Sequence, residues 1–276
     1  MRIFLALFIS LALVSCGGGK RRTDNPPEPS TETQIQSQTK PKVAVAKTHV
    51  RFNDSDRFDW TGRRPWSYAV HGIDVSKFQG DIDWQTLPRS GINFAYIKAT
   101  EGADHADDKF RENWHAAKRA GVLRGAYHFY YFCRTGAQQA RWFIQNVPRD
   151  AGALPPALDM EWNHKSRTCR HRPSPAKVRQ EMHSYLSIVT AHYGKRPIIY
   201  VTPDFYHENK LWRIHGYAFW LRSVADHPSA KYRGADWQFW QYTGTGRVDG
   251  IASNVDINTY SGTVKDWKDW VAANTH

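Results

Sequence analysis

Residue patterns that bind metal ions are scarce in this sequence of 276 residues. It holds only three cysteines, with no CxxC pair, and its thirteen histidines are scattered, with no HxxxH pair. Protein zinc sites need closely spaced thiolate or imidazole ligands, so we expect no metal ion and no cofactor. A scattered histidine is more often a hydrogen-bonded structural group than a ligand.

Long apolar runs are also missing, apart from residues 3–14, which follow Arg2. This run is shorter than the roughly 20 residues of a membrane-spanning helix, and it predicts a signal peptide over residues 1–15. Residues 13–16, Leu-Val-Ser-Cys, resemble the lipobox of bacterial lipoproteins, in which the thiol of the cysteine, here Cys16, is acylated and becomes the new N-terminus. An ordinary secretory signal is the alternative.

The next segment has little that could build a core. It is polar from Lys20 to about Trp60, with a proline-rich stretch and many Gln, Thr and Ser residues. Such composition predicts a disordered tether. We therefore assign residues 16–62 to the lipidated Cys16 and a tether, and residues 63–276 to one folded domain, a size common among α/β barrels.

Acidic residues are outnumbered, 26 Asp and Glu against 38 Lys and Arg, for a net charge of +12. A basic balance fits nucleic acid, an anionic envelope polymer, or no specific partner. Export and the lack of a basic run interleaved with aromatics at a nucleic-acid motif spacing argue against nucleic acid. We expect a monomer, exported and anchored to the membrane by lipid at the periplasmic face of the envelope. Because residue 17 is not Asp, the resemblance to sorted lipoproteins favours the outer membrane if one is present.

Two cysteines remain, Cys133 and Cys169, in a chain that enters an oxidising compartment. A disulfide between them is the simplest interpretation.

What the sequence does have, from residue 69 onward, is an alternation of short apolar runs and amphipathic stretches. The runs predict eight strands: residues 69–76, 92–100, 123–132, 155–162, 197–202, 217–223, 236–243 and 253–260. Residues 107–121 and 174–194 have the apolar spacing and end signals of crossover helices. Helical patterns thin out after the fifth strand. The fold class indicated is α/β, a modified TIM-like barrel.

Carboxylates stand at the ends of three of these strands: Asp74 at the first, Asp159 and Glu161 at the fourth, and Asp256 near the eighth. Barrel strands direct their C-terminal ends to one mouth, so we expect the four groups to converge. Asp159 and Glu161 point to the same face of a strand, where each raises the proton affinity of the other. One can then stay protonated near neutral pH, as general acid catalysis on an acetal requires. Surface carboxylates that cap helices or pair with Arg and Lys are the alternative.

Five segments together resemble glycoside hydrolase family 25, the Chalaropsis-type lysozymes. They are HGIDVSKFQGDIDW (71–84), FAYIKATEG (94–102), KFRENWHAAKRAGVLRGAYHFY (109–130), PPALDMEW (155–162) and WQFWQYTGTGRVDGIASNVDIN (237–258). That family cleaves the β-1,4 bond between N-acetylmuramic acid and N-acetylglucosamine in peptidoglycan. The resemblance implies five β/α units followed by three strands with few helices, and peptidoglycan glycan strands as the partner.

The resemblance also implies catalytic roles. Glu161 matches the general acid, Asp159 the group that orients or stabilises the 2-acetamido group of the substrate, and Asp74 and Asp256 the further active-site carboxylates. Two mechanisms stay open. In the first, the acetamido oxygen of the substrate attacks the anomeric carbon and Asp159 stabilises the oxazolinium ion. In the second, a carboxylate such as Asp74 or Asp256 activates a water molecule, which attacks instead.

Binding roles follow from the same resemblance. Lys98 and Tyr200 match polar positions that line the cleft, although Lys98 also fits as an ion-pair partner. Gln241 fits either an acetamido group or a bridge between backbone groups. Arg222 and Ser223 depart from the family, because a small apolar residue before an aromatic one is expected there.

Aromatic residues near the strand ends suit stacking on pyranose rings. We expect Tyr127 and Trp162 to line the groove, while Tyr130, Trp240 and Tyr242 fit the groove and the core equally well.

The loops after the third and fourth strands carry Cys133 and Cys169, so their disulfide would join two loops at the barrel mouth. Residues 163–174, in the second of these loops, are strongly basic, and no wall-binding repeat is recognisable. Two further functions fit the same features. One is a non-catalytic peptidoglycan-binding lipoprotein, and the other is a hydrolase of another N-acetylhexosamine polymer such as chitin.

Overall fold

The computed structural model describes residues 50–163 and 166–275. The predicted signal peptide, the lipidated Cys16 and the tether up to residue 49 lie outside them. No helix in these two ranges is long and apolar enough to cross a membrane.

Eight strands form a closed barrel, one for each strand that the sequence predicts. They are β2 (His71–Val75), β3 (Ile92–Glu101), β5 (Leu123–Phe129), β6 (Ala157–Met160), β7 (Ile198–Val201), β8 (Phe219–Arg222), β9 (Phe239–Arg247) and β10 (Val255–Tyr260). The strands pair in this order, β8 pairs with β9, and β10 closes the ring against β2. Within this ring only β10 runs antiparallel to its neighbours. The predicted α/β fold class, a modified TIM-like barrel, is confirmed.

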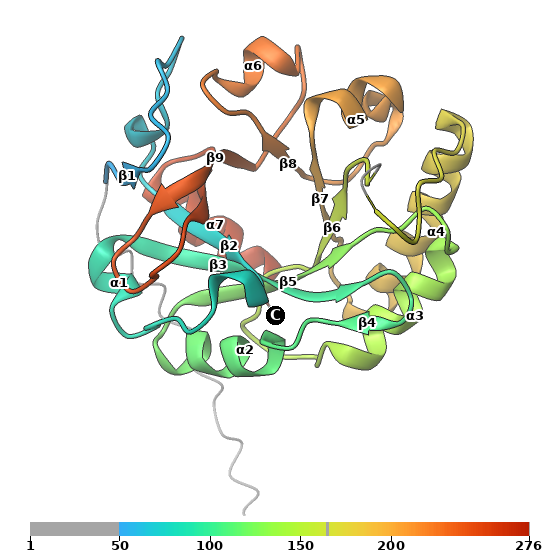
Figure 1. The fold of residues 1–276 in the computed structure, drawn as a ribbon, viewed down its shortest axis with the longest axis horizontal. Coiled ribbons are helices and arrows are strands. Elements are labelled where there is room, and N and C mark those ends of the chain that lie inside the picture. Colours follow the sequence, from blue (N-terminus) through green and yellow to red (C-terminus); the bar gives the residue numbers. More distant parts are fainter. Residues whose placement is uncertain (1–49, 164–165, 276) are drawn as a thin grey trace, which may run out of the picture. The chain divides into compact units, whose positions relative to one another are not determined.

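Helices follow each of the first five barrel strands. They are α1 (Leu87–Ser90), α2 (Phe110–Arg119), α3 (Gly136–Asn146), α4 (Pro175–Tyr193) and α5 (Pro203–Glu208). Figure 1 shows α2, α3 and α4 along one side of the barrel. After β8 comes only the four-residue α6 (Pro228–Lys231), and β9 leads to β10 without a helix. Five β/α units followed by three strands are therefore present.

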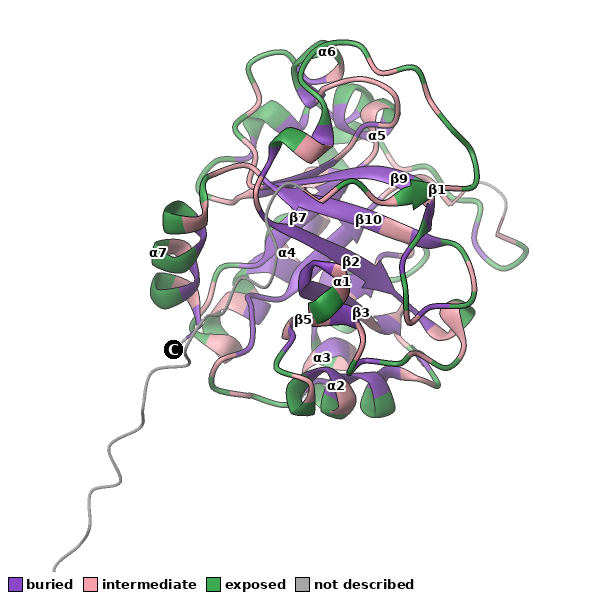
Figure 2. Cartoon of the chain, turned by 90° about the vertical axis from the view of Figure 1, so that its left-hand side faces the viewer, coloured by how far each residue is buried: buried purple, intermediate pink, exposed green. Residues whose placement is uncertain are grey.

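The two helices that the sequence predicts have clear end signals. Ser174 accepts a hydrogen bond from the backbone N–H of Lys177 at the start of α4, and Gly194 ends it in the left-handed conformation with φ of 69°. Helix α2 buries Phe110, Trp114 and Ala117 on one face, at the predicted spacing. In Figure 2 the outer faces of α2 and α7 (Val264–Asn274) are exposed, while the strands are buried.

The core has two layers, one between the strands and the outer helices and one inside the barrel. The inner layer is mostly aromatic, and Trp267 of α7 packs on Phe94 at 5.3 Å between ring centroids. Tyr96 fills the barrel beside Gly125, where an added Cβ would lie 2.3 Å from the tyrosine ring. Only glycine at position 125 leaves room for that ring.

The folded part begins before residue 63. Strand β1 (Asn53–Asp54) pairs antiparallel with the end of β9, and Phe52 and Trp60 pack on the outer core. Residues 50–62, which composition assigns to the tether, therefore lie against the barrel, because their aromatic side chains find apolar partners there. A second minor strand, β4 (His105–Ala106), pairs with the end of β3. Three 3-10 turns complete the elements: Pro65–Ser67, Lys77–Gln79 and Leu211–Arg213.

Candidate active site

The C-terminal ends of the parallel strands surround a pocket of about 360 Å³. All four predicted carboxylates line it. The full lining is Asp74, Val75, Ser76, Phe78, Gln79, Lys98, Tyr127, Phe129, Asp159, Glu161, Tyr200, Thr202, Trp220, Arg222, Gln241 and Asp256. A barrel fold brings these residues together from β2, β3, β5, β6, β7, β8, β9 and β10, as expected for its catalytic face.

Asp159 and Glu161 share the pocket, as the two-residue spacing predicts. Asp159 lies within β6 and is 9% exposed, whereas Glu161 follows the last residue of β6 and is half-buried. Burial and then the charge of Glu161 raise the pKa of Asp159 well above its usual range. Burial also raises the pKa of Glu161. The pair therefore holds a proton at a higher pH than an exposed carboxyl group does.

Asp74 and Asp256 form a second pair, because their residues lie directly opposite each other in the β2–β10 ladder. Burial raises the pKa of Asp74 to about 6. Burial and then the charge of Asp74 raise the pKa of Asp256 well above its usual range. Like charges placed opposite each other in a ladder repel, so this pair also favours one bound proton.

A chain of hydrogen bonds fixes Asp74. Its Oδ2 accepts from Nε2 of Gln241 at 3.0 Å and from Nδ2 of Asn258 at 2.8 Å. Tyr200 donates to Oε1 of Gln241 at 2.8 Å, and Nε1 of Trp220 donates to Oδ1 of Asn258 at 2.7 Å. Gln241 and Tyr200 thus line the pocket with their polar atoms already engaged by protein groups, which makes them positioning residues for Asp74.

Arg222 places a cation in this acidic pocket. Its guanidinium lies within 4.0 Å of no carboxylate oxygen in the described ranges, so it forms no direct ion pair there. At longer range it is a charge that lowers the pKa values of Glu161, Asp74 and Asp256 against the effect of burial. Position 222 is one of those at which the sequence departs from the family pattern, and the structure places the Arg222 side chain in the same pocket as the four acids.

Lys98 and Tyr127 also lie in the pocket. Nζ of Lys98 contacts Oε2 of Glu101 at 2.5 Å and lies 4.8 Å from the centre of the Phe129 ring. The ion-pair alternative for Lys98 is thus present, with Glu101 as its partner.

Trp162 lies outside the pocket lining. Successive strand residues point to opposite faces, so the residue after Glu161 turns away from the site. Its Nε1 donates to Glu208 at 2.7 Å, and its ring packs against Phe205 at 4.7 Å and Phe132 at 5.0 Å. The expectation that Trp162 lines the groove does not agree with this placement.

The other aromatic candidates are also absent from the lining. Tyr130 and Trp240 are fully buried in the outer core, and Tyr242 points to the outer face of β9. Cys133 and Cys169 are joined by a disulfide with Cα atoms 5.8 Å apart, which links the loops after β5 and β6.

Sequence reasoning did not assign Phe78 and Trp220 to the pocket or Asn258 to its support, and it named Arg222 only as a departure from the family pattern. Phe78 is 76% exposed at the pocket, an unusual position for a large apolar side chain. Its place after the first strand, within the motif at 71–84, was the available signal. In the two described ranges no group of three His, Cys, Asp or Glu residues could hold a metal ion.

Comparisons with known proteins agree with this geometry. The pattern of the family described as "Glycosyl hydrolases family 25" matches residues 73–251. Protein YegX of Escherichia coli K12 is 38% identical over 214 residues, covering 76% of each chain. Lysozyme M1 of Streptomyces globisporus is 35% identical over 210 residues, covering 71% of this chain and 69% of its own. The crystal structure of a lysozyme from Streptomyces coelicolor superposes with a TM-score of 0.67 at 33% identity, covering 74% of this chain and 97% of its own. The chain therefore belongs to glycosyl hydrolases family 25.

Proposed function

We propose that this protein is a peptidoglycan muramidase, which hydrolyses the β-1,4 bond between N-acetylmuramic acid and N-acetylglucosamine. The observation that carries the proposal is the gathering of Asp74, Asp159, Glu161 and Asp256 in one pocket at the strand ends. Relatives named as lysozymes support the choice of substrate. A protein that only binds glycan has no need of buried acids that retain a proton.

Glu161 is the proposed general acid. It extends past the end of β6 and is half-buried, so its carboxyl group is more accessible to a glycosidic oxygen than that of Asp159. Because burial raises its pKa, the group keeps its proton to a higher pH than an exposed glutamic acid does. In the reaction that proton passes to the departing sugar oxygen as the bond to the anomeric carbon breaks.

Asp159 is the proposed partner of the substrate's acetamido group. Its Oδ1 is buried and accepts no hydrogen bond from any described residue, so it is ready to accept one from the acetamido N–H. Attack by the acetamido oxygen on the anomeric carbon then forms an oxazolinium ion beside Asp159. The positive charge of the oxazolinium ion favours the ionised form of Asp159, and that carboxylate in turn stabilises the cation.

The stereochemistry of the first product tests the role of Asp159. Attack by the acetamido group followed by water retains the β configuration, whereas direct attack by water activated by Asp74 or Asp256 inverts it. Proton NMR of a soluble substrate during the first turnovers distinguishes the two anomers. An initial α product would refute the assisted mechanism while leaving the muramidase assignment intact.

Product analysis tests the activity itself. The full-length chain and its Glu161→Gln variant digest purified peptidoglycan, the products are reduced with borohydride, and mass spectrometry identifies the reduced sugar. We expect reduced muramic acid ends, lost in the variant. Reduced glucosamine ends, or cleavage of chitin in a parallel digest at an equal rate, would refute the muramidase assignment. No new ends from a folded protein that sediments with the polymer would favour the binding function.

We also propose that the protein acts outside the cytoplasm as a monomer anchored by lipid on Cys16. The disulfide between Cys133 and Cys169 supports an oxidising compartment. Metabolic labelling with a fatty-acid analogue should mark the wild type and not a Cys16→Ala variant, and light scattering should give the mass of one chain. Equal labelling of both would refute the anchor.

A further inference from the structure

A second pocket, of about 370 Å³, lies on the outside of the barrel. Nine of its ten lining residues come from positions 50–66, which lie outside the family match at 73–251, and the tenth is Tyr242 of β9. The neighbouring residue Gln241 lines the catalytic pocket. Since successive strand residues point to opposite faces, the two pockets lie on opposite sides of β9.

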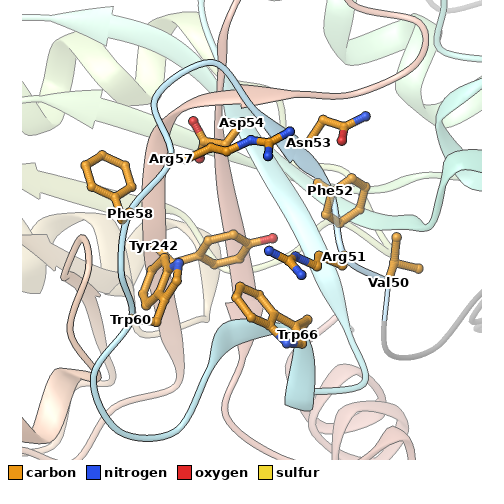
Figure 3. Close-up of a pocket in the computed structure, with 10 residues that line it drawn as sticks. All are labelled: Val50, Arg51, Phe52, Asn53, Asp54, Arg57, Phe58, Trp60, Trp66 and Tyr242. Atoms are coloured by element: carbon orange, nitrogen blue, oxygen red, sulfur yellow. The ribbon is translucent and has the colours of Figure 1, made fainter.

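Aromatic rings form the walls of this outer pocket, as Figure 3 shows. Trp60 contacts Trp66 edge-on at 6.1 Å and Tyr242 edge-on at 6.2 Å between ring centroids. Trp60 also packs on the buried Trp240 at 5.7 Å, which anchors the segment to β9. The walls are thus held by the core of the barrel.

Two guanidinium groups line the same pocket, those of Arg51 and Arg57. Arg51 lies over the Trp66 ring at 4.5 Å, and Figure 3 shows it beside the hydroxyl end of Tyr242. Neither arginine lies within 4.0 Å of a carboxylate oxygen in the described part of the chain. Arg51 is therefore held in place by a ring that leaves its N–H donors free for a ligand.

A hydrogen-bond acceptor completes the lining. Oδ1 of Asp54 already accepts from the hydroxyl of Thr245 at 2.7 Å and from the backbone N–H of Asp56 at 3.0 Å. These contacts orient the carboxylate, whose other oxygen is suited to accept from a sugar hydroxyl. Aromatic walls, a carboxylate and free guanidinium groups together fit a sugar ring with a carboxylate-bearing substituent.

We propose that the outer pocket is a second binding site for peptidoglycan, which takes an N-acetylmuramyl-peptide unit through a sugar ring and the free carboxylates of its peptide. This inference rests on peptidoglycan being the substrate polymer of the proposed function. The outer pocket has nearly the volume of the catalytic one, about 370 against 360 Å³, so both accept a ligand of similar size. Two sites on one barrel bind a polymer together more tightly than either does alone, by raising the effective concentration of the second contact.

A paired substitution tests the site. Arg51→Gln/Arg57→Gln removes both free cations from exposed positions, and Arg111→Gln/Arg119→Gln on α2 removes the same charge from an exposed face far along the chain. All variants carry Glu161→Gln, so that bound polymer is not cut. Co-sedimentation of the full-length chain with insoluble peptidoglycan then gives the affinity.

We expect about tenfold weaker sedimentation for Arg51→Gln/Arg57→Gln and little change for the α2 control. Calorimetry with a soluble muramyl-peptide fragment should show two binding sites, one of them lost in the Arg51/Arg57 variant, while chitotetraose, which has no carboxylate, should not distinguish the variants. Equal weakening by both variants would indicate net charge alone and overturn the proposal, as would a single site for the fragment in the parent. These readouts measure binding, so they stand even if the chain cuts no polymer.

In the active background the effect should depend on substrate size. Arg51→Gln/Arg57→Gln should slow hydrolysis of insoluble peptidoglycan and leave kcat/KM on a short soluble glycan unchanged. An equal loss on both substrates would mean that the substitutions disturb the catalytic pocket through β9, and would overturn the proposal.

Discussion

Replacing Asp74 by Asn should stabilise the folded protein at neutral pH while reducing activity. In the folded state Asp74 keeps its proton up to about pH 6, whereas an ordinary aspartic acid has a pKa of 3.8. The folded state therefore binds more protons between these values. The contribution of Asp74 to stability is present at low pH and is lost as the pH rises through about 6.

The size of the effect follows from the shift in pKa. The change from 3.8 to about 6 corresponds to about 3 kcal/mol at about 1.4 kcal/mol per unit. Asparagine has no proton to lose, and its side-chain oxygen can still accept from Gln241 and Asn258. We therefore expect the stability of Asp74→Asn relative to wild type to increase by up to about 3 kcal/mol between pH 4 and pH 8.

Urea unfolding of both proteins at several pH values measures this difference. Burial lowers the pKa of His128 to about 4, so this histidine makes the free energy of unfolding increase as the pH rises. It does so equally in both proteins and therefore cancels in their difference. Asp83→Asn is the control, because the Thr86 hydroxyl lowers the pKa of Asp83 below 3.8, so the stability of that variant relative to wild type should change little between pH 4 and pH 8. A relative stability of Asp74→Asn that stays constant from pH 4 to pH 8 would refute the reasoning.

Three further substitutions test the site and its supports. Arg222→Gln removes a cation that lowers the pKa of Glu161, so the alkaline limb of the pH–activity profile should move to higher pH, while Arg222→Lys should leave it in place. A move to lower pH would contradict this. Cys133→Ser/Cys169→Ser removes a disulfide that spans 36 residues and should lower the free energy of unfolding by about 2–4 kcal/mol. The two loops should then be cleaved by protease faster than the barrel, and an unchanged urea midpoint would contradict the expectation. Trp162→Phe, outside the pocket, should change kcat/KM by less than about threefold and lower the melting temperature; a loss of about a hundredfold would return Trp162 to the site.

The strands and the four acids could be predicted from the sequence because both depend on local patterns. Short β-rich runs fix the strands, and the barrel then brings their ends together. Of the helices longer than six residues, α3 and α7 were not located by their apolar patterns, although α3 begins with a capping box at Thr135 and Gln138, which indicates a helix start. The apolar content of α3 is modest, and its stability comes from packing on α4.

The parts that failed depend on contacts between distant segments. Arg222 reads as a mere departure from a pattern until the charges of Glu161, Asp74 and Asp256 are placed around it. Residues 50–62 are polar on average, which predicts a tether. Their aromatic residue Trp60 nevertheless packs on Trp240 and Tyr242, which lie almost two hundred residues later in the chain. The sequence indicates a polar side chain at Gln241 in the site. Only the hydrogen bonds of the structure show that its amide group is already bonded to Asp74 and Tyr200.

The absence of a side chain at Gly125 affects residues of the catalytic pocket that Gly125 itself does not contact. Tyr96, which fills that space, lies 4.9 Å from the ring of Trp220, and Trp220 both lines the catalytic pocket and holds Asn258 against Asp74. A methyl group at position 125 would push on Tyr96, and through it on the floor beneath the acids. In a mutational scan for activity, this buried glycine should behave as a member of the active site although it touches no substrate.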